Sequence, residues 1–209
     1  MSASTSLPDT ISLIGMPGAG KSTVGVILAK LTGLRFVDTD LDIQVREDAT
    51  LQQIIERHGY QYLRDVEQQV LLEIPLEHAI ISTGGSVVYS EAVMLRLRKA
   101  GPVVYLAADL ASLERRVAAA PLRGIACDPS QGYAGVFAER TPLYRRHADI
   151  AVDATAGTAA VVAAANLLKL LGLITGRYRL AAGGACPVDA SGRVQIDPMA
   201  RRYRPTTGN

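Results

Sequence analysis

The chain has 209 residues, of which 48% are hydrophobic, and its formal net charge at neutral pH is +2. This length is typical of one α/β domain with an appendage, and the hydrophobic fraction is sufficient for a buried core. The charge is uneven: residues 177–209 hold six Arg and two Asp, and the rest holds 16 basic and 18 acidic residues. The globular part therefore gives no basis for nucleic-acid binding, and any such binding would depend on the tail.

The sequence shows no sign of export, membrane insertion or a metal cluster. Residues 1–9 are polar and lack the apolar core of a signal peptide, and the longest apolar run, 161–174, is too short to span a bilayer. Cys127 and Cys186 form no C-x-x-C pair, and the histidines show no ligand spacing. We expect a cytoplasmic, monomeric protein that does not contact membranes.

A phosphate-binding motif lies near the N-terminus. Residues 15–23 read G-M-P-G-A-G-K-S-T, which fits G-x-x-x-x-G-K-[ST] without a mismatch. An apolar run at 11–14 precedes the motif and a helical pattern at 24–31 follows it, which is the order that the motif requires. The glycines allow backbone N–H groups to face phosphate oxygens, and the helix N-terminus adds partial positive charge. The motif predicts a nucleoside triphosphate, with Lys21 at the β- and γ-phosphates and Ser22 ligating Mg²⁺.

The second strand is expected at 34–37, and it ends in two carboxylates, Asp38 and Asp40. These lie at the carboxyl edge of the predicted sheet, where open α/β sheets bind ligands. One carboxylate near Ser22 would serve the metal ion, and the other would face an acceptor hydroxyl.

Two helices are predicted next. Thr50 and the three residues after it form a capping-box pattern that opens a helix through residue 57, closed by Gly59. A second amphipathic helix is expected over 61–72. In that helix Arg64 and Glu67 are three residues apart, a spacing that would allow them to pair with each other.

The remaining chain alternates strand and helix patterns. A glycine pair follows the next strand, which suggests close backbone approach to a ligand. Residues 121–133 show little periodicity and several Gly and Pro, which is typical of a mobile lid. The predicted strands are 79–82, 103–106 and 150–152, and the predicted helices are 90–100, 109–119, 135–147 and an apolar helix ending near 171.

This alternation predicts an α/β fold with a five-stranded parallel sheet and helices on both of its faces. We expect one domain over residues 1–175, with a lid at about 120–134. Residues 176–209 are rich in Gly, Pro and Arg and are expected to form a basic, partly disordered tail.

The phosphate loop alone does not distinguish a GTPase, an ATPase motor and a small-molecule kinase. The strand at 79–82 does not end in the metal-binding Asp of an ordinary motor or GTPase, and no N-K-x-D guanine-reading segment occurs. The acidic pair after the second strand instead favours a kinase with a small acceptor.

Several short segments, in one order, resemble the shikimate kinases, a branch of the nucleoside monophosphate kinase-like P-loop proteins. Beside the phosphate loop and the D-T-D segment at 38–40, L-R-D-V-E at 63–67 stands where the family has F-R-x-x-E. S-T-G-G at 82–85 matches the start of S-x-G-G-G, and R-T-P-L-Y at 140–144 matches R-x-P-L-Y. The resemblance covers residues 11–153, most of the chain.

The resemblance implies ATP and Mg²⁺ as cofactors and a role for each matching residue. Asp38 would assist the metal together with Ser22, and Asp40 would hold the acceptor hydroxyl and take its proton. Arg64 and Arg140 would bind the substrate carboxylate, as bidentate arginines do best, and Gly84 and Gly85 would present backbone N–H groups. The nucleotide would contact Gly15, Gly18, Ala19, Gly20, Lys21, Ser22, Thr23 and, at the adenine, Arg115 or Arg116, of which we favour Arg116.

Two positions depart from the family pattern. Ala120 stands where the family lid has an arginine before Pro-Leu, and Arg123, three residues later, is our candidate to replace it as a catalytic cation. Ser86 replaces the third glycine of the strand-end motif, which is tolerable only if its φ is negative.

Three functions remain open from these patterns. The first is ATP-dependent phosphorylation of the shikimate 3-hydroxyl in aromatic amino-acid biosynthesis. The second is a related kinase acting on another small hydroxylated acid, suggested by Ala120 and Ser86. The third is a weakly active nucleotide-binding module that regulates a partner through its basic tail.

Overall fold

The computed structural model describes residues 8–119, 124–128, 130–155, 179–180 and 203–204. Its centre is a five-stranded, fully parallel sheet in the order β2-β3-β1-β4-β5, which confirms the predicted fold class. The strands are β1 (Thr10–Ile14), β2 (Arg35–Asp38), β3 (Ala79–Ser82), β4 (Val103–Ala107) and β5 (Ile150–Asp153).

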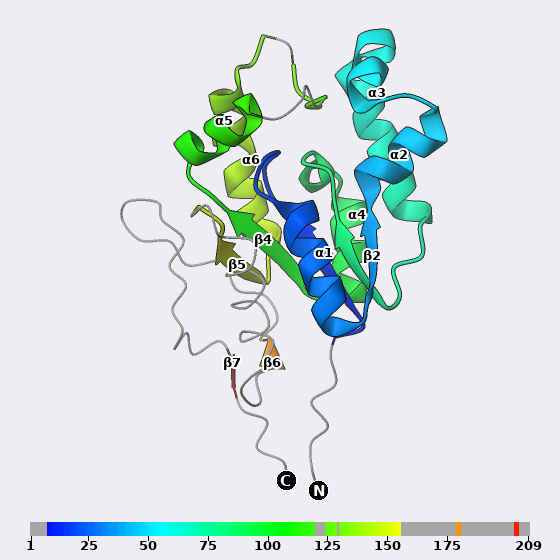
Figure 1. The fold of residues 1–209 in the computed structure, drawn as a ribbon, viewed down its shortest axis with the longest axis vertical. Coiled ribbons are helices and arrows are strands. Elements are labelled where there is room, and N and C mark those ends of the chain that lie inside the picture. The colour runs from blue at the N-terminus through cyan, green and yellow to red at the C-terminus, as the bar shows by residue number, and fades with distance from the viewer. Residues whose placement is uncertain (1–7, 120–123, 129, 156–178, 181–202, 205–209) are drawn as a thin grey trace, which may run out of the picture.

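Helices cover both faces of the sheet (Figure 1). Helix α1 contacts β2 and β3 on one face, whereas α4 and α6 contact β1 and β4 on the other. The helices are α1 (Lys21–Thr32), α2 (Thr39–Glu47), α3 (Leu51–Glu73), the 3₁₀ helix η1 (Val87–Tyr89), α4 (Glu91–Ala100), α5 (Leu110–Ala118) and α6 (Tyr133–His147). Within the residues described, no helix is both long and apolar enough to cross a membrane.

The central strands are buried on both faces, as expected for a parallel sheet between two helical layers. Every residue of β1, β3 and β4 is buried, and their apolar side chains form the main core with those of α1 and α4. A smaller core fills the space between α2, α3 and the segment around residue 126. Its buried members are Ile43, Ile54, Leu63, Val66, Val70 and Ala126.

Local capping signals in the sequence are confirmed. The Thr50 hydroxyl accepts the N–H of Gln53, and the Gln53 side chain accepts the N–H of Thr50 at 2.9 Å, which completes the capping box of α3. Asp109 caps α5 by accepting the N–H of Ser112 at 2.8 Å. Gly59 has φ 84° and ψ 166°, so it interrupts the helical backbone as expected, although α3 continues directly beyond it.

Helix α2 was missed by the sequence analysis. Its apolar residues Leu41, Ile43 and Val45 alternate with polar ones, so they give no helical stripe, and only Ile43 is buried. Asp38 nevertheless opens the helix, since its Oδ1 accepts the N–H of Asp40 at 3.1 Å. Asp40 therefore lies in the first turn of a helix rather than on a loop.

The C-terminal predictions are only partly covered by the described residues. Helix α6 begins at Tyr133, so the end of the predicted lid is helical, and β5 extends through Asp153. The closing helix, and with it the boundary of the tail, lies outside the described residues. In the tail, β6 (Arg179–Leu180) pairs antiparallel with β7 (Tyr203–Arg204).

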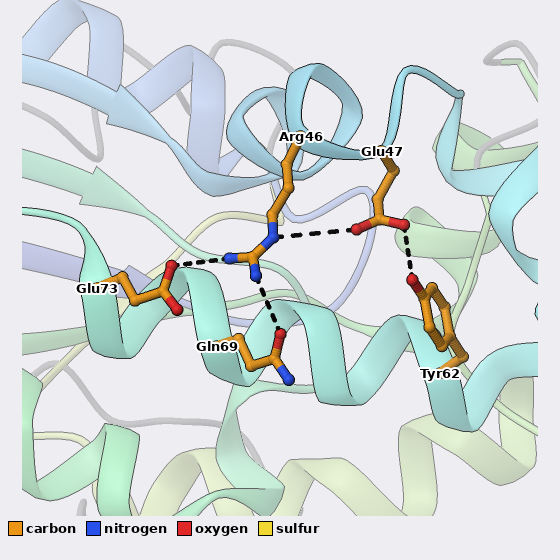
Figure 2. A network of polar contacts seen from close by, with 5 residues as sticks. All are labelled: Arg46, Glu47, Tyr62, Gln69 and Glu73. Carbon is orange, nitrogen blue, oxygen red and sulfur yellow. Dashed lines mark hydrogen bonds and ion pairs between the residues drawn. The ribbon is translucent and has the colours of Figure 1, made fainter.

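A surface network joins α2 to α3 (Figure 2). Arg46 forms an ion pair with Glu73 at 2.8 Å and donates to the Gln69 side chain at 3.2 Å. Tyr62 donates to Glu47, the residue after Arg46, at 2.8 Å. Since α2 carries Asp40, this network helps to hold the helix of that carboxylate against α3.

Core burial should matter more to stability than this network. Leu28→Ala should lower the free energy of unfolding by about 2–5 kcal/mol, because Leu28 is fully buried in the main core. Arg46→Ala should cost less than about 1 kcal/mol, because both partners of its ion pair are substantially exposed. Urea unfolding of the two variants measures both values, and equal losses would contradict this ranking.

Candidate functional site

The phosphate loop connects β1 to α1 in the geometry that its glycines allow. Gly15, Gly18 and Gly20 have φ values of 147°, 83° and 91°, which L side chains rarely adopt. At Gly15 a Cβ would also lie 2.8 Å from the carbonyl oxygen of Leu106. Gly20 precedes the first turn of α1, so the loop ends at a helix N-terminus, a ready site for an anion.

Lys21 lies at the base of this loop with only 9% of its surface exposed. Its Nζ donates to the carbonyl oxygens of Gly15 at 2.9 Å and Met16 at 3.1 Å. Burial lowers the pKa of Lys21, and the nearby carboxylates of Asp40, Asp38 and Glu67 oppose that shift. Within the described part of the chain, the hydrogen-bond partners of this buried ammonium are carbonyl oxygens, so it is suited to gain an anionic partner beside the loop.

The two residues predicted at the metal lie on adjacent segments. The Ser22 hydroxyl is 3.4 Å from that of Ser82, and Asp38 is the parallel-sheet partner of Ser82. Hydroxyl and carboxylate oxygens are the donors that Mg²⁺ prefers, so the residues present fit this ion. Within the part of the chain that is described, no group of three or more His, Cys, Asp or Glu is arranged to hold a metal. A metal ion here would need further oxygens, such as those of phosphates or water.

A single cavity of about 380 Å³ joins the phosphate loop to the carboxyl edge of the sheet. Pro17 to Val24 form one wall, and Arg116 and Ala154 lie beside that wall. The other wall brings together residues of α2, α3, α6, the strand-end loop and the segment at 124–126. Its polar members are Asp40, Glu67, Thr83, Ser86 and Arg140.

Two carboxylates approach each other over Gly84. An added Cβ at Gly84 would collide with the Glu67 carboxylate and would lie 3.1 Å from Oδ1 of Asp40. Glu67 is only 4% exposed, and burial, partly offset by a hydrogen bond from Ser86, raises its pKa to about 7. The absent side chain at residue 84 thus leaves room for both carboxylates at the cavity.

Arg64 and Glu67 do not form the local pair that their spacing allows. Glu67 instead accepts a hydrogen bond from Ser86, and Arg64 turns toward the segment at 124–128. The spacing of three residues permits a local pair, but the tertiary contacts of α3 supply each side chain with a different partner.

The two predicted arginines converge although they are far apart in sequence. Arg64 Nε donates to the Ala126 carbonyl at 3.1 Å, and Arg140 Nη2 donates to the same oxygen at 2.5 Å. Arg140 is almost fully buried, with 1% exposed. Two guanidinium groups on one carbonyl oxygen form a place where a carboxylate would be bound strongly.

Tyr89 holds both arginines. The Arg64 guanidinium carbon lies 4.2 Å from the centre of the Tyr89 ring, and Arg140 Nε donates to the Tyr89 hydroxyl at 3.3 Å. That hydroxyl in turn donates to Glu139 at 2.6 Å. Desolvation is the main cause of the raised pKa of Tyr89, so the phenol stays neutral at physiological pH.

The role expected for the strand-end glycines needs one correction. The N–H of Gly84 donates to the Thr39 hydroxyl at 3.1 Å, so it is not available to a ligand in this structure. Gly84 instead contributes space, because its missing side chain makes room for the carboxylates of Glu67 and Asp40. The backbone of Gly85 is fixed by α6, because the Tyr144 hydroxyl donates to its carbonyl at 2.6 Å. Ser86 has φ −92°, which meets the condition set for a residue with a side chain there.

Of the two candidate adenine arginines, Arg116 lines the cavity. Arg116 donates to the carbonyl oxygens of Gly18 at 3.3 Å and of Ala154 at 2.7 Å. Arg115 instead donates to the Ser112 hydroxyl on its own helix at 2.9 Å. Ala120 and Arg123, the altered lid position and its candidate replacement, lie outside the described residues.

Three residues of this site were not predicted as functional from the sequence: Glu67, Ser86 and Tyr89. Glu67 lies within the segment 63–67 and Ser86 at the end of the glycine motif, so the family resemblance marked both positions. No sequence pattern marked Tyr89, because its place between the arginines depends on a 3₁₀ helix that packs against α3 and α6.

Comparisons with known proteins agree with this geometry. The family model for shikimate kinase matches residues 17–170. Shikimate kinase from Mycobacterium avium (strain 104) is 39% identical over 145 residues, 68% of this chain and 81% of that protein. Shikimate kinase 2 from Enterobacter sp. (strain 638) is 36% identical over 150 residues, 69% of this chain and 86% of that protein.

Solved structures give the same result. Shikimate kinase from Acinetobacter baumannii in complex with shikimate has a TM-score of 0.69 and 30% identity, covering 82% of this chain and 97% of that one. The enzyme from Aquifex aeolicus has a TM-score of 0.66 and 30% identity, covering 79% of this chain and 98% of that one. Together with the phosphate loop and the paired arginines, these matches show that the chain belongs to the shikimate kinase family.

Proposed function

We propose that this protein is an ATP-dependent kinase that phosphorylates the 3-hydroxyl of shikimate, a step of aromatic amino-acid biosynthesis. The observation that carries the proposal is the continuity of this cavity, which joins a phosphate loop to buried arginine and carboxylate side chains. Shikimate has one carboxylate and three hydroxyls, so it offers a partner to both kinds of side chain. A related structure that superposes on most of this chain is described as a complex with shikimate.

The phosphate-loop wall would bind ATP. Backbone N–H groups of Gly15, Gly18, Ala19, Gly20 and Thr23 would surround the phosphates at the start of α1. Lys21 would exchange its carbonyl partners for phosphate oxygens and stabilise the charge that develops during transfer. Arg116, fixed beside Gly18, is our candidate for the adenine side.

Ser22 and Asp38 would hold Mg²⁺, and this ion would supply positive charge that offsets the charge of the phosphates.

The opposite wall would bind the acid and orient its hydroxyl. Arg64 and Arg140 would take the carboxylate in place of the Ala126 carbonyl. Asp40 would accept the proton of the 3-hydroxyl while that oxygen forms its bond to the γ-phosphorus. The bond from this phosphorus to the β–γ bridging oxygen breaks, and ADP leaves with the electron pair. A closed lid would exclude water, which is the competing acceptor.

A coupled assay of ADP release tests this function. Wild-type protein with ATP, Mg²⁺ and shikimate should turn over, whereas other sugar acids should be poor acceptors. Asp40→Asn should lower kcat by at least about 10²-fold with little change in ATP affinity, because an amide cannot take the proton.

Lys21→Met is the matched control on the nucleotide side, and it should remove turnover with every acceptor. Turnover with another acid and none with shikimate would redirect the proposal to a related substrate. ATP binding without any turnover would support a regulatory module instead.

Tyr89 allows a test of the arginine pair that leaves both arginines in place. Tyr89→Phe keeps the ring under Arg64 but removes the hydroxyl partner of Arg140, so the KM for shikimate should rise by about 2–5-fold. Tyr89→Leu removes both contacts and should raise it by about tenfold or more. In both variants kcat and the KM for ATP should change by less than about twofold. An unchanged KM for shikimate in Tyr89→Leu would contradict this assignment.

The altered lid gives a separate prediction. If Arg123 replaces the arginine that the family carries at position 120, Arg123→Ala should lower kcat by at least about 10²-fold. Ala120→Arg in that background should restore part of the loss. A wild-type rate in Arg123→Ala would show that Lys21, Mg²⁺ and Arg140 suffice as charges at the transfer.

A further inference from the structure

Ser86 gives this chain a side chain where the family pattern has a third glycine. The residue is 6% exposed and lines the cavity. Its φ of −92° is accessible to any L residue, so the side chain adds no backbone strain. Its hydroxyl donates to Oε2 of Glu67, across 19 positions of the sequence. A glycine at this position would leave that carboxylate oxygen without its donor.

Of the two carboxylate oxygens of Glu67, Oε2 accepts the hydrogen bond from Ser86. Among the described residues, its Oε1 has no hydrogen-bond partner, although the side chain is only 4% exposed. That oxygen lies over Gly84, beside Oδ1 of Asp40, at the acceptor end of the cavity. A buried carboxylate oxygen without a donor is costly, so this position favours a ligand that brings a hydroxyl or water.

The charged groups around Glu67 come from three other helices. Lys21 on α1 and Arg140 on α6 favour its charged form, and Asp40 on α2 opposes it. Burial is the largest influence and raises the pKa of Glu67 to about 7, while the hydrogen bond from Ser86 acts in the opposite direction. The protonation of Glu67 at neutral pH is therefore closely balanced, and the Ser86 hydroxyl is one of the groups that decide it.

We infer that Ser86 is a positioning residue: its hydroxyl holds Oε2 of Glu67 by a hydrogen bond and leaves Oε1 directed at the hydroxyls of the acceptor. The inference rests on the proposed kinase function, because it assigns this role at the acceptor end of the same cavity. This role is not open to the glycine of the family pattern, because glycine has no side-chain hydroxyl that could donate a hydrogen bond.

The sign of the pH effect follows from the chemistry of a carboxylate. Glu67 loses its charge as the pH falls through its pKa, and with it the ability of Oε1 to accept from a substrate hydroxyl. Removing the Ser86 hydroxyl raises the pKa of Glu67 further, so this loss should begin at a higher pH. A hydrogen bond to a charged group corresponds to a shift of about one to two pH units.

The test measures kcat/KM for shikimate as a function of pH on both sides of 7, in the full chain. In Ser86→Ala and Ser86→Gly, the acidic limb of the profile should move upward by about one to two pH units relative to wild type. Ser86→Thr retains the hydroxyl, so its limb should stay near the wild-type position. The KM for ATP at a pH above both limbs should be the same in all four proteins.

Glu67→Gln separates positioning from a general structural effect. This variant should lose the acidic limb, and Ser86→Ala in the Glu67→Gln background should then add less than about a twofold change. A loss of kcat/KM that is the same at every pH, or the same in both backgrounds, would overturn the inference. It would show that Ser86 acts by packing alone.

A direct titration of the Glu67 carboxyl group tests the role of Ser86 without any substrate. The side-chain carboxyl signal of Glu67 in ¹³C-labelled protein, assigned by its absence in Glu67→Gln, should titrate at a higher pH in Ser86→Ala than in wild type. Identical titrations would overturn the role of Ser86 even if shikimate is the substrate. A shifted titration without turnover of shikimate would support Ser86 and contradict the proposed function.

Discussion

Buried charges of both signs depend on one another in this protein. Lys21, Glu67 and Arg140 are each less than a tenth exposed, and each would be costly to bury alone. The electrostatic influences on Lys21 include Asp40, Asp38, Glu67 and Arg140, so the phosphate loop and the acceptor wall form one electrostatic unit. The cavity can therefore hold an anion at each end without a large unbalanced charge in between.

The order of the sheet makes this balance possible. Strand β1 lies at the centre, so the phosphate loop at its end has β3 on one side and β4 on the other. The connection from β2 to β3 carries α2 and α3, which bring Asp40, Arg64 and Glu67 to the same edge. Helix α6 then supplies Arg140 together with two tyrosines. Tyr133 donates to the Pro17 carbonyl at 2.5 Å, and Tyr144 donates to that of Gly85. One helix thus fixes the phosphate loop and the strand-end loop relative to each other.

The fold was accessible from the sequence because its signals are local. Apolar runs separated by helical patterns predict a parallel sheet, and Thr50 and Asp109 mark helix starts through hydrogen bonds to residues three positions away. Helix α2 was missed for the opposite reason. Ile43 is its only buried apolar residue, and its stability comes from a cap at Asp38 and from contacts with α3, including the ion pair of Arg46. Those contacts carry no periodic signal.

The site was predicted only in part. The sequence by itself determined the phosphate loop, because glycines at fixed spacing impose a backbone path that few other residues can follow. It also placed Asp40, Arg64 and Arg140 in the site through the family resemblance. Only the tertiary structure decided the partners: Arg64 with Ala126 instead of Glu67, Glu67 with Ser86, and Tyr89 between the arginines. Such partners are chosen by packing between segments far apart in the chain, and no spacing along the sequence records that choice.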